Sequence, residues 1–173
     1  MDLLELVLFI LPAYVANASP VILGGKMPLD LGQKFIDKKR ILGSSKTIKG
    51  FIAGTAAGTL AGIVLAVAVP QFLPSFSLIE KTAVSFLLSF GALLGDSIGS
   101  FIKRRRGLES GRESLVTDKI WFLVVSLLLA FPFYSGKLNL ELIDVVFLFV
   151  LTFFLHIAFN RIAHLLKLKK VPW

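Results

Sequence analysis

The chain has 173 residues, of which 55% are hydrophobic and 16 are Phe, and its mean hydropathy is +0.82. This composition excludes a soluble globular domain, because soluble domains are less apolar and carry more charge than the 17% found here. The absence of Cys excludes disulfides, thiol catalysis and thiolate metal ligands. The net charge of +8 indicates either a one-sided membrane topology or attraction to anionic lipid head groups. Nucleic acid is not an expected partner, because no binding module is recognisable and the aromatic residues lie in apolar segments.

Five apolar segments predict an all-α integral membrane protein with about five transmembrane helices. They cover residues 3–23, 50–69, 82–102, 120–134 and 142–163. A helix rises about 1.5 Å per residue and the hydrocarbon core is about 30 Å thick, so a span needs about 20 residues. The fourth segment is shorter than that, and we expect it to use flanking residues or a thinned bilayer. The loops are too short to fold alone, so residues 1–173 are predicted to form one transmembrane domain.

The basic residues are distributed asymmetrically along the chain. Of the 19 Lys and Arg residues, 17 lie in 24–49, in 103–119 or near the C-terminal end, which leaves Lys81 and Lys137 on the other side. Short cytoplasmic loops carry the excess of Lys and Arg in membrane proteins. We therefore expect a multi-pass protein of the cell membrane, with its N-terminus outside, its C-terminus in the cytoplasm and a polar cavity open to the cytoplasmic side.

The first and last spans carry polar residues at membrane depth. In the first span, Pro12, Asn17, Ser19 and Pro20 predict a kink or break with a polar lining. Asn17 is interpreted either as a substrate-binding cavity residue or as part of an interhelical hydrogen bond. In the last span, His156, Asn160 and His164 recur every four residues and share one helix face. No third and fourth metal ligands are evident nearby, so cavity lining or head-group contact is the preferred interpretation of this face.

The second span begins with a segment rich in hydroxyls and lysines. It contains Ser44, Ser45, Lys46, Thr47 and Lys49, directly before and within the predicted start of a helix. Backbone N–H groups at a helix N-terminus, together with hydroxyls and lysine, form an anion site. The segment is not a Walker A loop, because that pattern needs Gly at positions 40 and 45. A capping turn with two lysines that only mark topology is the alternative interpretation.

Four glycines, Gly50, Gly54, Gly58 and Gly62, recur every four residues in the second span. Small residues at this spacing let helix backbones approach closely in lipid, where no hydrophobic force draws helices together. We therefore expect the stripe to hold this span, and the lysines at its start, against its neighbours.

The third span contains an acidic residue, Asp96, about two turns before the basic run 103–106. An ionised Asp at a helix centre costs roughly 2.5–3.5 kcal/mol, so such a residue usually faces a wet cavity or a charged partner. On a helix, Asp96 shares a stripe with Ser100, Lys103 and Arg104. This pattern predicts a site for a metal and a polyphosphate. The alternatives are a salt bridge that fixes the helix register and a basic cluster that marks topology alone.

A second carboxylate, Asp118, lies at the entrance to the fourth span. Magnesium usually takes one or two carboxylates and completes its octahedron with water and phosphate oxygens. Asp96 and Asp118 are therefore predicted Mg²⁺ ligands, and Lys103 with its basic neighbours is predicted to hold phosphate.

These motifs resemble those of the membrane-bound CDP-lipid synthases (phosphatidate cytidylyltransferases), most closely their archaeal branch, the CDP-archaeol synthases. The family pattern runs Ser-Pro-x-Lys-Thr-x-x-Gly early, and Gly-Asp, Ser, Lys-Arg, Gly and Asp later. Residues 44–50 match the early part, and the later part is matched by Gly95, Asp96, Ser100, Lys103, Arg104, Gly107 and Asp118. The archaeal likeness covers nearly the whole chain, including 12–17 and 171–173. Three features depart from the bacterial type: Ser45 replaces Pro, residues 110–114 replace its Pro-Gly-His-Gly-Gly loop, and Lys119 replaces Arg.

The resemblance implies nucleotidyl transfer, in which an ether-linked, geranylgeranyl-bearing glycerol 1-phosphate attacks the α-phosphorus of CTP and pyrophosphate leaves. It implies Mg²⁺ as cofactor, and CTP and a membrane lipid phosphate as partners. Both reactants are anionic, so positioning and charge neutralisation supply most of the catalysis. The implied catalytic residues are Asp96, Asp118, Lys46 and Lys103. The implied substrate-binding residues are Ser44, Ser45, Thr47, Lys49, Asn17, Ser100, Arg104, Arg105 and Arg112.

Three other functions make different demands on the sequence. A phosphotransferase that consumes CDP-lipid would carry an Asp-x-x-Asp-Gly type motif, which does not occur here. A small transporter or channel subunit would place polar residues deeper in the spans and on both sides, whereas the charges here cluster on one side. An enzyme like the CTP-dependent polyprenol kinases stays open as an alternative, and it would transfer the γ-phosphate.

Overall fold

The computed structural model describes residues 1–110 and 117–168, and within the second range it describes side chains from residue 120 onward. The helices are α1 (Leu3–Ala18), α2 (Pro20–Leu23), α3 (Ile48–Ala68), α4 (Leu78–Arg105), α5 (Thr117–Tyr134) and α6 (Leu142–Leu165). Two isolated β-bridges join residues 28 and 47 and residues 34 and 40, and the described ranges contain no strand. The predicted all-α class is confirmed.

Within the described residues, four helical segments are long and apolar enough to cross a membrane. They are Leu3–Leu23, Ile48–Ala68, Leu78–Arg105 and Leu142–Leu165. The apolar part of α5, Ile120–Tyr134, is shorter, as the sequence predicted. The first span consists of α1 and α2, which meet at Ser19, so the predicted break in this span is confirmed. Pro12 lies inside α1. The chain is a multi-pass membrane protein.

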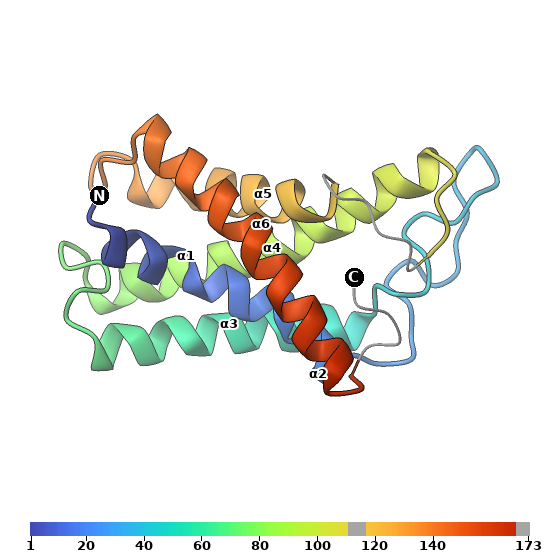
Figure 1. Cartoon of the computed structure of the whole chain (residues 1–173), viewed down its shortest axis with the longest axis horizontal. Helices are drawn as coiled ribbons and strands as arrows, with labels where there is room; N and C mark the ends of the chain where they lie inside the picture. The colour runs from blue at the N-terminus through green and yellow to red at the C-terminus, as the bar shows by residue number, and fades with distance from the viewer. Residues whose placement is uncertain (111–116, 169–173) are drawn as a thin grey trace.

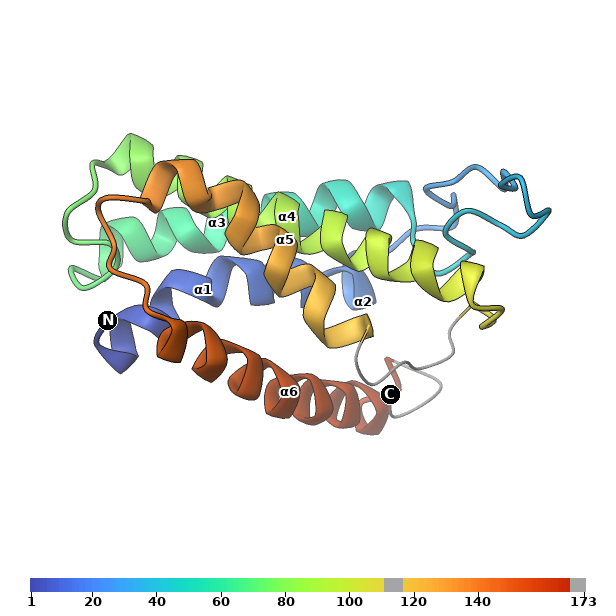
Figure 2. The same cartoon turned by 90° about the horizontal axis from the view of Figure 1, so that it is seen from above.

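The helices lie side by side in an elongated bundle (Figure 1). α1, α3 and α4 pack against one another, and α5 packs along α4. α6 crosses the bundle obliquely and lies at its edge (Figure 2). The long loop 24–47 and the C-terminal end of α4 lie together at one end, which we call the loop end, and the N-terminus lies at the other. The assignment of the loop end to the cytoplasm stays a prediction.

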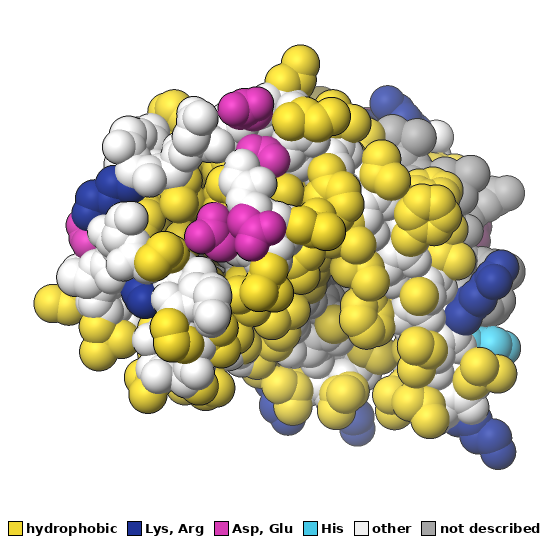
Figure 3. All heavy atoms as spheres, turned by 60° about the vertical axis from the view of Figure 1, so that its left-hand side comes forward, with side chains coloured by type: hydrophobic (Ala, Val, Ile, Leu, Met, Phe, Trp, Pro, Cys, Tyr) yellow, Lys and Arg dark blue, Asp and Glu magenta, His cyan; other side chains and the backbone are white. Residues whose placement is uncertain are grey.

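The sides of the bundle are apolar, whereas acidic side chains gather at the end that carries the N-terminus (Figure 3). Large apolar side chains are exposed along the outward faces of the long helices, among them Leu60, Val64 and Val67 of α3. The core, which includes Phe9, Phe122 and Leu148, joins α1, α5 and α6. An apolar belt of this kind is the surface that a lipid-embedded bundle needs.

The glycine stripe is the contact face of α3. The buried residues of α3 are Gly50, Gly54, Gly58 and Gly62. A Cβ atom at Gly58 would lie 2.4 Å from the Pro12 carbonyl oxygen and 2.3 Å from Ser89 Oγ, so α1 and α4 approach too closely for any side chain here. The predicted packing role is confirmed. This close approach brings the start of α3, with the loop before it, against α4.

Candidate functional site

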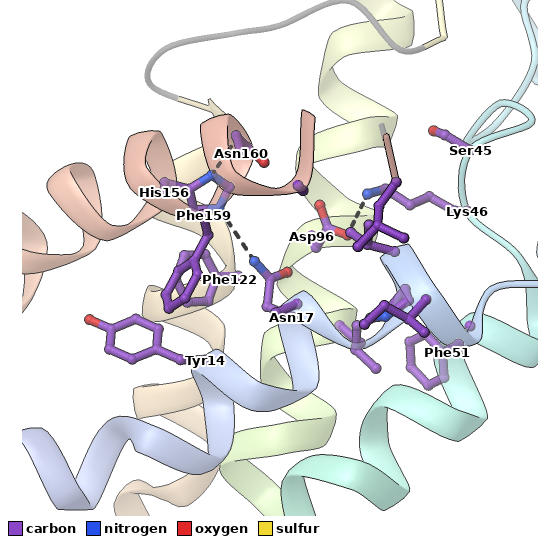
Figure 4. Close-up of a pocket in the computed structure, with 18 of the residues that line it drawn as sticks. Tyr14, Asn17, Ser45, Lys46, Phe51, Asp96, Phe122, His156, Phe159 and Asn160 are labelled. Atoms are coloured by element: carbon purple, nitrogen blue, oxygen red, sulfur yellow. Dashed lines mark hydrogen bonds and ion pairs between the residues drawn. The ribbon is translucent and has the colours of Figure 1, made fainter. Parts of the chain in front are cut away.

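A cavity of about 540 Å³ lies toward the loop end of the bundle, walled by residues of every helix. Figure 4 shows its labelled side chains converging on one space. Its polar lining consists of Tyr14, Asn17, Ser45, Lys46, Thr47, Asp96, Ser97, Lys103, Thr152, His156 and Asn160. Apolar side chains complete the wall, including Ile22, Phe122 and Phe159. A cavity of this size suits a ligand of nucleotide size.

Asp96 and Lys46 form an ion pair inside this cavity (Figure 4). Both side chains are partly open, with 21% of Asp96 and 24% of Lys46 exposed. A lone charged side chain is costly at membrane depth, and the ion pair gives each of these two side chains a partner of opposite charge. The salt bridge that the sequence offered as an alternative is therefore present. It also sits in an open cavity, where a ligand can reach both partners.

The start of α3 is a capping turn beside the cavity. Thr47 Oγ1 accepts hydrogen bonds from the backbone N–H groups of Gly50 and Gly25, both at 3.1 Å, and so caps α3. Thr47 and Ser45 line the cavity. Ser44 is exposed, does not line the cavity, and its hydroxyl lies 3.3 Å from that of Ser110. Lys49 is also exposed and outside the wall.

The stripe predicted on α4 divides into two groups. Lys103 lines the cavity with Asp96, and only 8% of it is exposed. Ser100 and Arg104 are buried on the same helix and are not part of the cavity wall. The structure therefore brings together Asp96, Lys46 and Lys103 in the cavity wall, and it places Ser100 and Arg104 outside that wall.

Arg105 contacts the long loop and lies outside the cavity wall. Its guanidinium donates hydrogen bonds to the Asp37 carboxylate at 2.6 Å and to the Arg40 carbonyl at 2.5 Å. It also lies over the rings of Phe35 and Phe101, 5.0 and 4.9 Å from their centroids. Such stacking of Arg on aromatic faces is favourable. Arg105 thus fastens the loop to the end of α4.

A buried carboxylate, Asp30, organises the same loop and was missed by the sequence analysis. It forms an ion pair with Arg40 and accepts hydrogen bonds from the N–H groups of Leu42 and Gly43 at 2.9 Å and of Gly32 at 3.0 Å. Burial alone would raise the pKa of Asp30, but Arg40 and these N–H groups hold the pKa well below its usual range. The signal that was available is the Asp-x-Gly turn, in which an Asp side chain commonly bonds the backbone two residues on.

A second polar cluster lines the cavity opposite the ion pair. Asn17 Nδ2 lies 3.3 Å from His156 Nε2, and Asn160 Nδ2 lies 3.4 Å from His156 Nδ1. Tyr14 and Thr152 share a hydroxyl hydrogen bond of 2.8 Å. The predicted cavity lining is confirmed for His156 and Asn160. Asn17 makes the interhelical hydrogen bond and also lines the cavity, and its role in substrate binding stays a prediction.

Two residues of this lining, Tyr14 and Thr152, were missed by the sequence analysis, and His164 lies outside the cavity wall although it continues the stripe. Thr152 stands four residues before His156, so extending the helix-face pattern by one turn would have found it. Tyr14 carries no such signal, because its partner lies on a distant helix.

A family model described as CarS-like, CDP-archaeol synthase, matches residues 1–173. The chain belongs to the CDP-archaeol synthase family. The CDP-archaeol synthase of Pyrococcus furiosus is 45% identical over 171 residues, which cover 99% of this chain and 98% of that protein. The CDP-archaeol synthase of Methanococcus maripaludis strain C7 is 42% identical over 182 residues, which cover 100% of both. A solved structure described as an intramembrane enzyme for archaeal membrane lipids biosynthesis has a TM-score of 0.80 at 35% identity, covering 92% of this chain and 94% of that one.

Two predicted site residues of this CDP-archaeol synthase family member fall where the structure gives no side chain. Arg112 lies outside the described residues, as does the terminal segment 171–173. Asp118 belongs to the first turn of α5, but its side chain also lies outside them, so its role as second carboxylate stays a prediction. Within the residues that are described, no three His, Asp or Glu side chains form a group that could hold a metal.

Proposed function

We propose that this chain transfers CMP from CTP to the phosphate of an ether-linked, geranylgeranyl-bearing glycerol 1-phosphate, forming a CDP-archaeol-type lipid and pyrophosphate. The observation that carries the proposal is a single cavity with two kinds of wall. Lys46, Asp96 and Lys103 provide a charged part suited to a triphosphate, and exposed apolar side chains of α2 and α6 adjoin it. A reaction between a water-soluble nucleotide and a lipid needs both. Family membership supports the same assignment.

The cations of the cavity supply charge neutralisation. Lys46 is paired with Asp96. The phosphate oxygens of CTP are alternative partners for the ammonium group of Lys46. Movement of Lys46 toward the triphosphate uncovers the Asp96 carboxylate. Lys103 is almost fully buried, and attraction between charges is stronger in such a low-dielectric environment. Lys46 and Lys103 therefore hold the triphosphate in the cavity.

The Asp96 carboxylate fits a magnesium site, because it is a hard oxygen donor in a polar cavity beside the proposed phosphate position. One or two carboxylates, completed by phosphate oxygens and water, form the usual Mg²⁺ set. Asp96 would hold the ion, with Asp118 as the proposed second ligand. When bound, Mg²⁺ supplies neutralisation of phosphate oxygens during in-line displacement.

The reaction needs no protein nucleophile. An oxygen of the lipid phosphate forms a bond to the α-phosphorus of CTP, and the bond to the leaving pyrophosphate breaks. The residues of the chain accelerate this step by orienting two anionic groups and offsetting their repulsion. Tyr14, Asn17 and Thr152 keep the deeper part of the cavity polar.

The test uses purified protein in detergent with Mg²⁺, an ether-lipid phosphate and CTP labelled at either the α- or the γ-phosphorus. We expect the α-label in the lipid product, the γ-label in pyrophosphate, and no turnover when EDTA removes the metal. Transfer of the γ-label to the lipid would show a kinase instead. Absence of turnover with both ether- and ester-linked lipid phosphates would refute the proposed activity.

A further inference from the structure

The cavity contains two polar groups of different character. The charged group, Lys46, Asp96 and Lys103, comes from the segment before α3 and from α4. The uncharged group, Asn17 and His156 with its neighbour Asn160, comes from α1 and α6. Figure 4 shows Asp96 with Lys46 on one side of the space and His156 with Asn160 on the other, with Asn17 between them. The charged group is sufficient to bind the triphosphate of CTP, so the uncharged group has no role in binding it.

The proposed reaction needs a second phosphate in the same cavity. A lipid monophosphate and a triphosphate repel each other, so the monophosphate needs its own hydrogen-bond donors. The amide groups of Asn17 and Asn160 and the imidazole of His156 carry N–H donors and no negative charge. Hydrogen bonds from such donors to a phosphate are charge-assisted and stronger than those between neutral partners.

The two contacts between amide and ring within the cluster are weak. Both amide-to-ring distances, 3.3 and 3.4 Å, are longer than the usual 2.9–3.0 Å or so of an N–H hydrogen bond. A neutral imidazole accepts at only one of its two nitrogens, so His156 cannot accept from Asn17 and Asn160 at once. An incoming phosphate therefore replaces weak hydrogen bonds with strong ones.

The wall beside the cluster is apolar and open. Ile22 of α2, Ile162 of α6 and Leu166, which directly follows α6, line the cavity and are 71%, 49% and 64% exposed. A polar nucleotide gains little from contact with apolar surfaces, whereas the hydrocarbon chains of a lipid pack against them. We infer that Asn17, His156 and Asn160 bind the phosphate head of the lipid substrate, with its chains against Ile22 and Leu166. This inference rests on the proposed function and assigns the second substrate its place.

The decisive experiment measures the KM for CTP and the KM for lipid phosphate separately, the latter as surface mole fraction in mixed micelles. His156→Leu removes the donors and is expected to raise the lipid KM about 10- to 100-fold. The KM for CTP should change less than about twofold, because the charged group is intact. His156→Gln keeps an N–H donor and is expected to recover part of the loss. His164→Leu, on the same helix but outside the cavity wall, is the matched control and should change neither constant.

A merely structural role for His156 would shift both KM values, or lower kcat alone, and either outcome overturns the inference. An unchanged lipid KM in His156→Leu also overturns it. If that variant does not fold, as judged by its thermal unfolding in detergent, Asn160→Leu is held to the same criteria. Wild-type protein without turnover would refute the proposed function. Normal wild-type turnover with no selective change in the variants would refute only the lipid-phosphate subsite.

Discussion

The two sides of the cavity differ in how firmly they are built. In the most apolar part of α4, 56% of the residues are buried, whereas in the most apolar part of α6 only 17% are buried. The loop beside α4 is fastened by Asp30 and Arg105. The buried residues of α6 are Asp144, Leu148 and Thr152, all in its first half, whereas residues of its second half line the cavity.

This difference suits the two ligands that we propose. A triphosphate needs charges held in fixed positions before it arrives, because reorganising them during the reaction is costly. A lipid with long chains needs an apolar surface more than a fixed geometry. Substitutions on the α4 side should therefore act on the reaction or on the fold, and those on the α6 side on lipid binding.

The largest effect on activity is expected from a change to the Asp96 carboxylate on the α4 side of the cavity. Asp96→Asn keeps the shape but removes the charge, and kcat/KM should fall by at least about 10³-fold, because several kcal/mol of charge stabilisation is lost. Pyrophosphate release measures this change, and Asp118→Asn should cause a loss of the same order. Asp2→Asn is the control, since Asp2 makes no side-chain cap hydrogen bond and lies at the other end. Near-normal activity of Asp96→Asn would remove Asp96 from the site.

The next largest effect on activity is expected from Lys46, and Lys49, three residues further along the chain, serves as its comparison. Lys46→Met should lower kcat/KM by about 10²-fold, because it removes a cation from the phosphate position and leaves Asp96 unpaired. Lys49→Met should lower it less than about threefold, since Lys49 is exposed and outside the cavity wall. The same pyrophosphate assay compares them. A loss in Lys49→Met as large as that in Lys46→Met would assign Lys49 a direct substrate contact.

A smaller effect should come from the packing that holds α3 against α1 and α4. Gly58→Ala places a methyl group 2.4 Å from the Pro12 carbonyl oxygen, and overpacking of this kind costs about 1–3 kcal/mol of the free energy of unfolding. Unfolding in mixed detergent micelles measures the cost. Ala56→Val, on the exposed face of the same helix, should be nearly neutral. An unchanged stability of Gly58→Ala would mean that these helices separate readily.

The smallest expected effect is local to the loop and depends on pH. Since the pKa of Asp30 is lowered in the folded chain, its carboxylate stabilises the loop above the unfolded pKa of about 4. This stabilisation is lost as the pH falls from there through the folded value. The protection of residues 30–43 against hydrogen exchange, measured relative to the intrinsic exchange rate at each pH, should therefore fall in acid.

Two variants sharpen that measurement. Asp30→Asn should show fast exchange over residues 30–43 already at pH 7. Asp37→Asn should change it less, because a half-exposed ion pair such as that of Asp37 with Arg105 contributes only about 0–1 kcal/mol. Equal exchange of wild type and Asp30→Asn at neutral pH would contradict the role of Asp30.

Most of the fold was predictable from hydropathy, because each span is a long apolar run. The largest error in a boundary concerns the third span, predicted to start at residue 82, whereas α4 begins at Leu78. Its start is fixed by a capping box, in which Ser77 N–H donates to the Glu80 carboxylate at 2.9 Å and Ser77 Oγ accepts from Glu80 N–H at 3.4 Å. An apolar run does not include such polar ends, so hydropathy alone does not reveal where the helix begins.

The site was predictable where a residue is chemically unusual for its setting. Asp96 stood out because acids are rare in spans, and Lys103 because it lies seven residues on, within about 20° of Asp96 around a helix. Arg105 is nine residues on and so about 180° away, which places it on the side of the loop. The His156 cluster could be seen as a stripe, but its partner Asn17 lies 139 residues away and only the fold brings them together.

The glycine stripe of α3 also has a consequence for how the chain assembles. Its outward positions are apolar, so hydropathy alone is sufficient for α3 to enter the bilayer as an independent helix. Its docking then depends on the absence of side chains at Gly54 and Gly58, which lets α1 and α4 come close. Insertion and association are thus governed by different faces of one helix, and a change in the stripe would leave insertion intact and act on the later association.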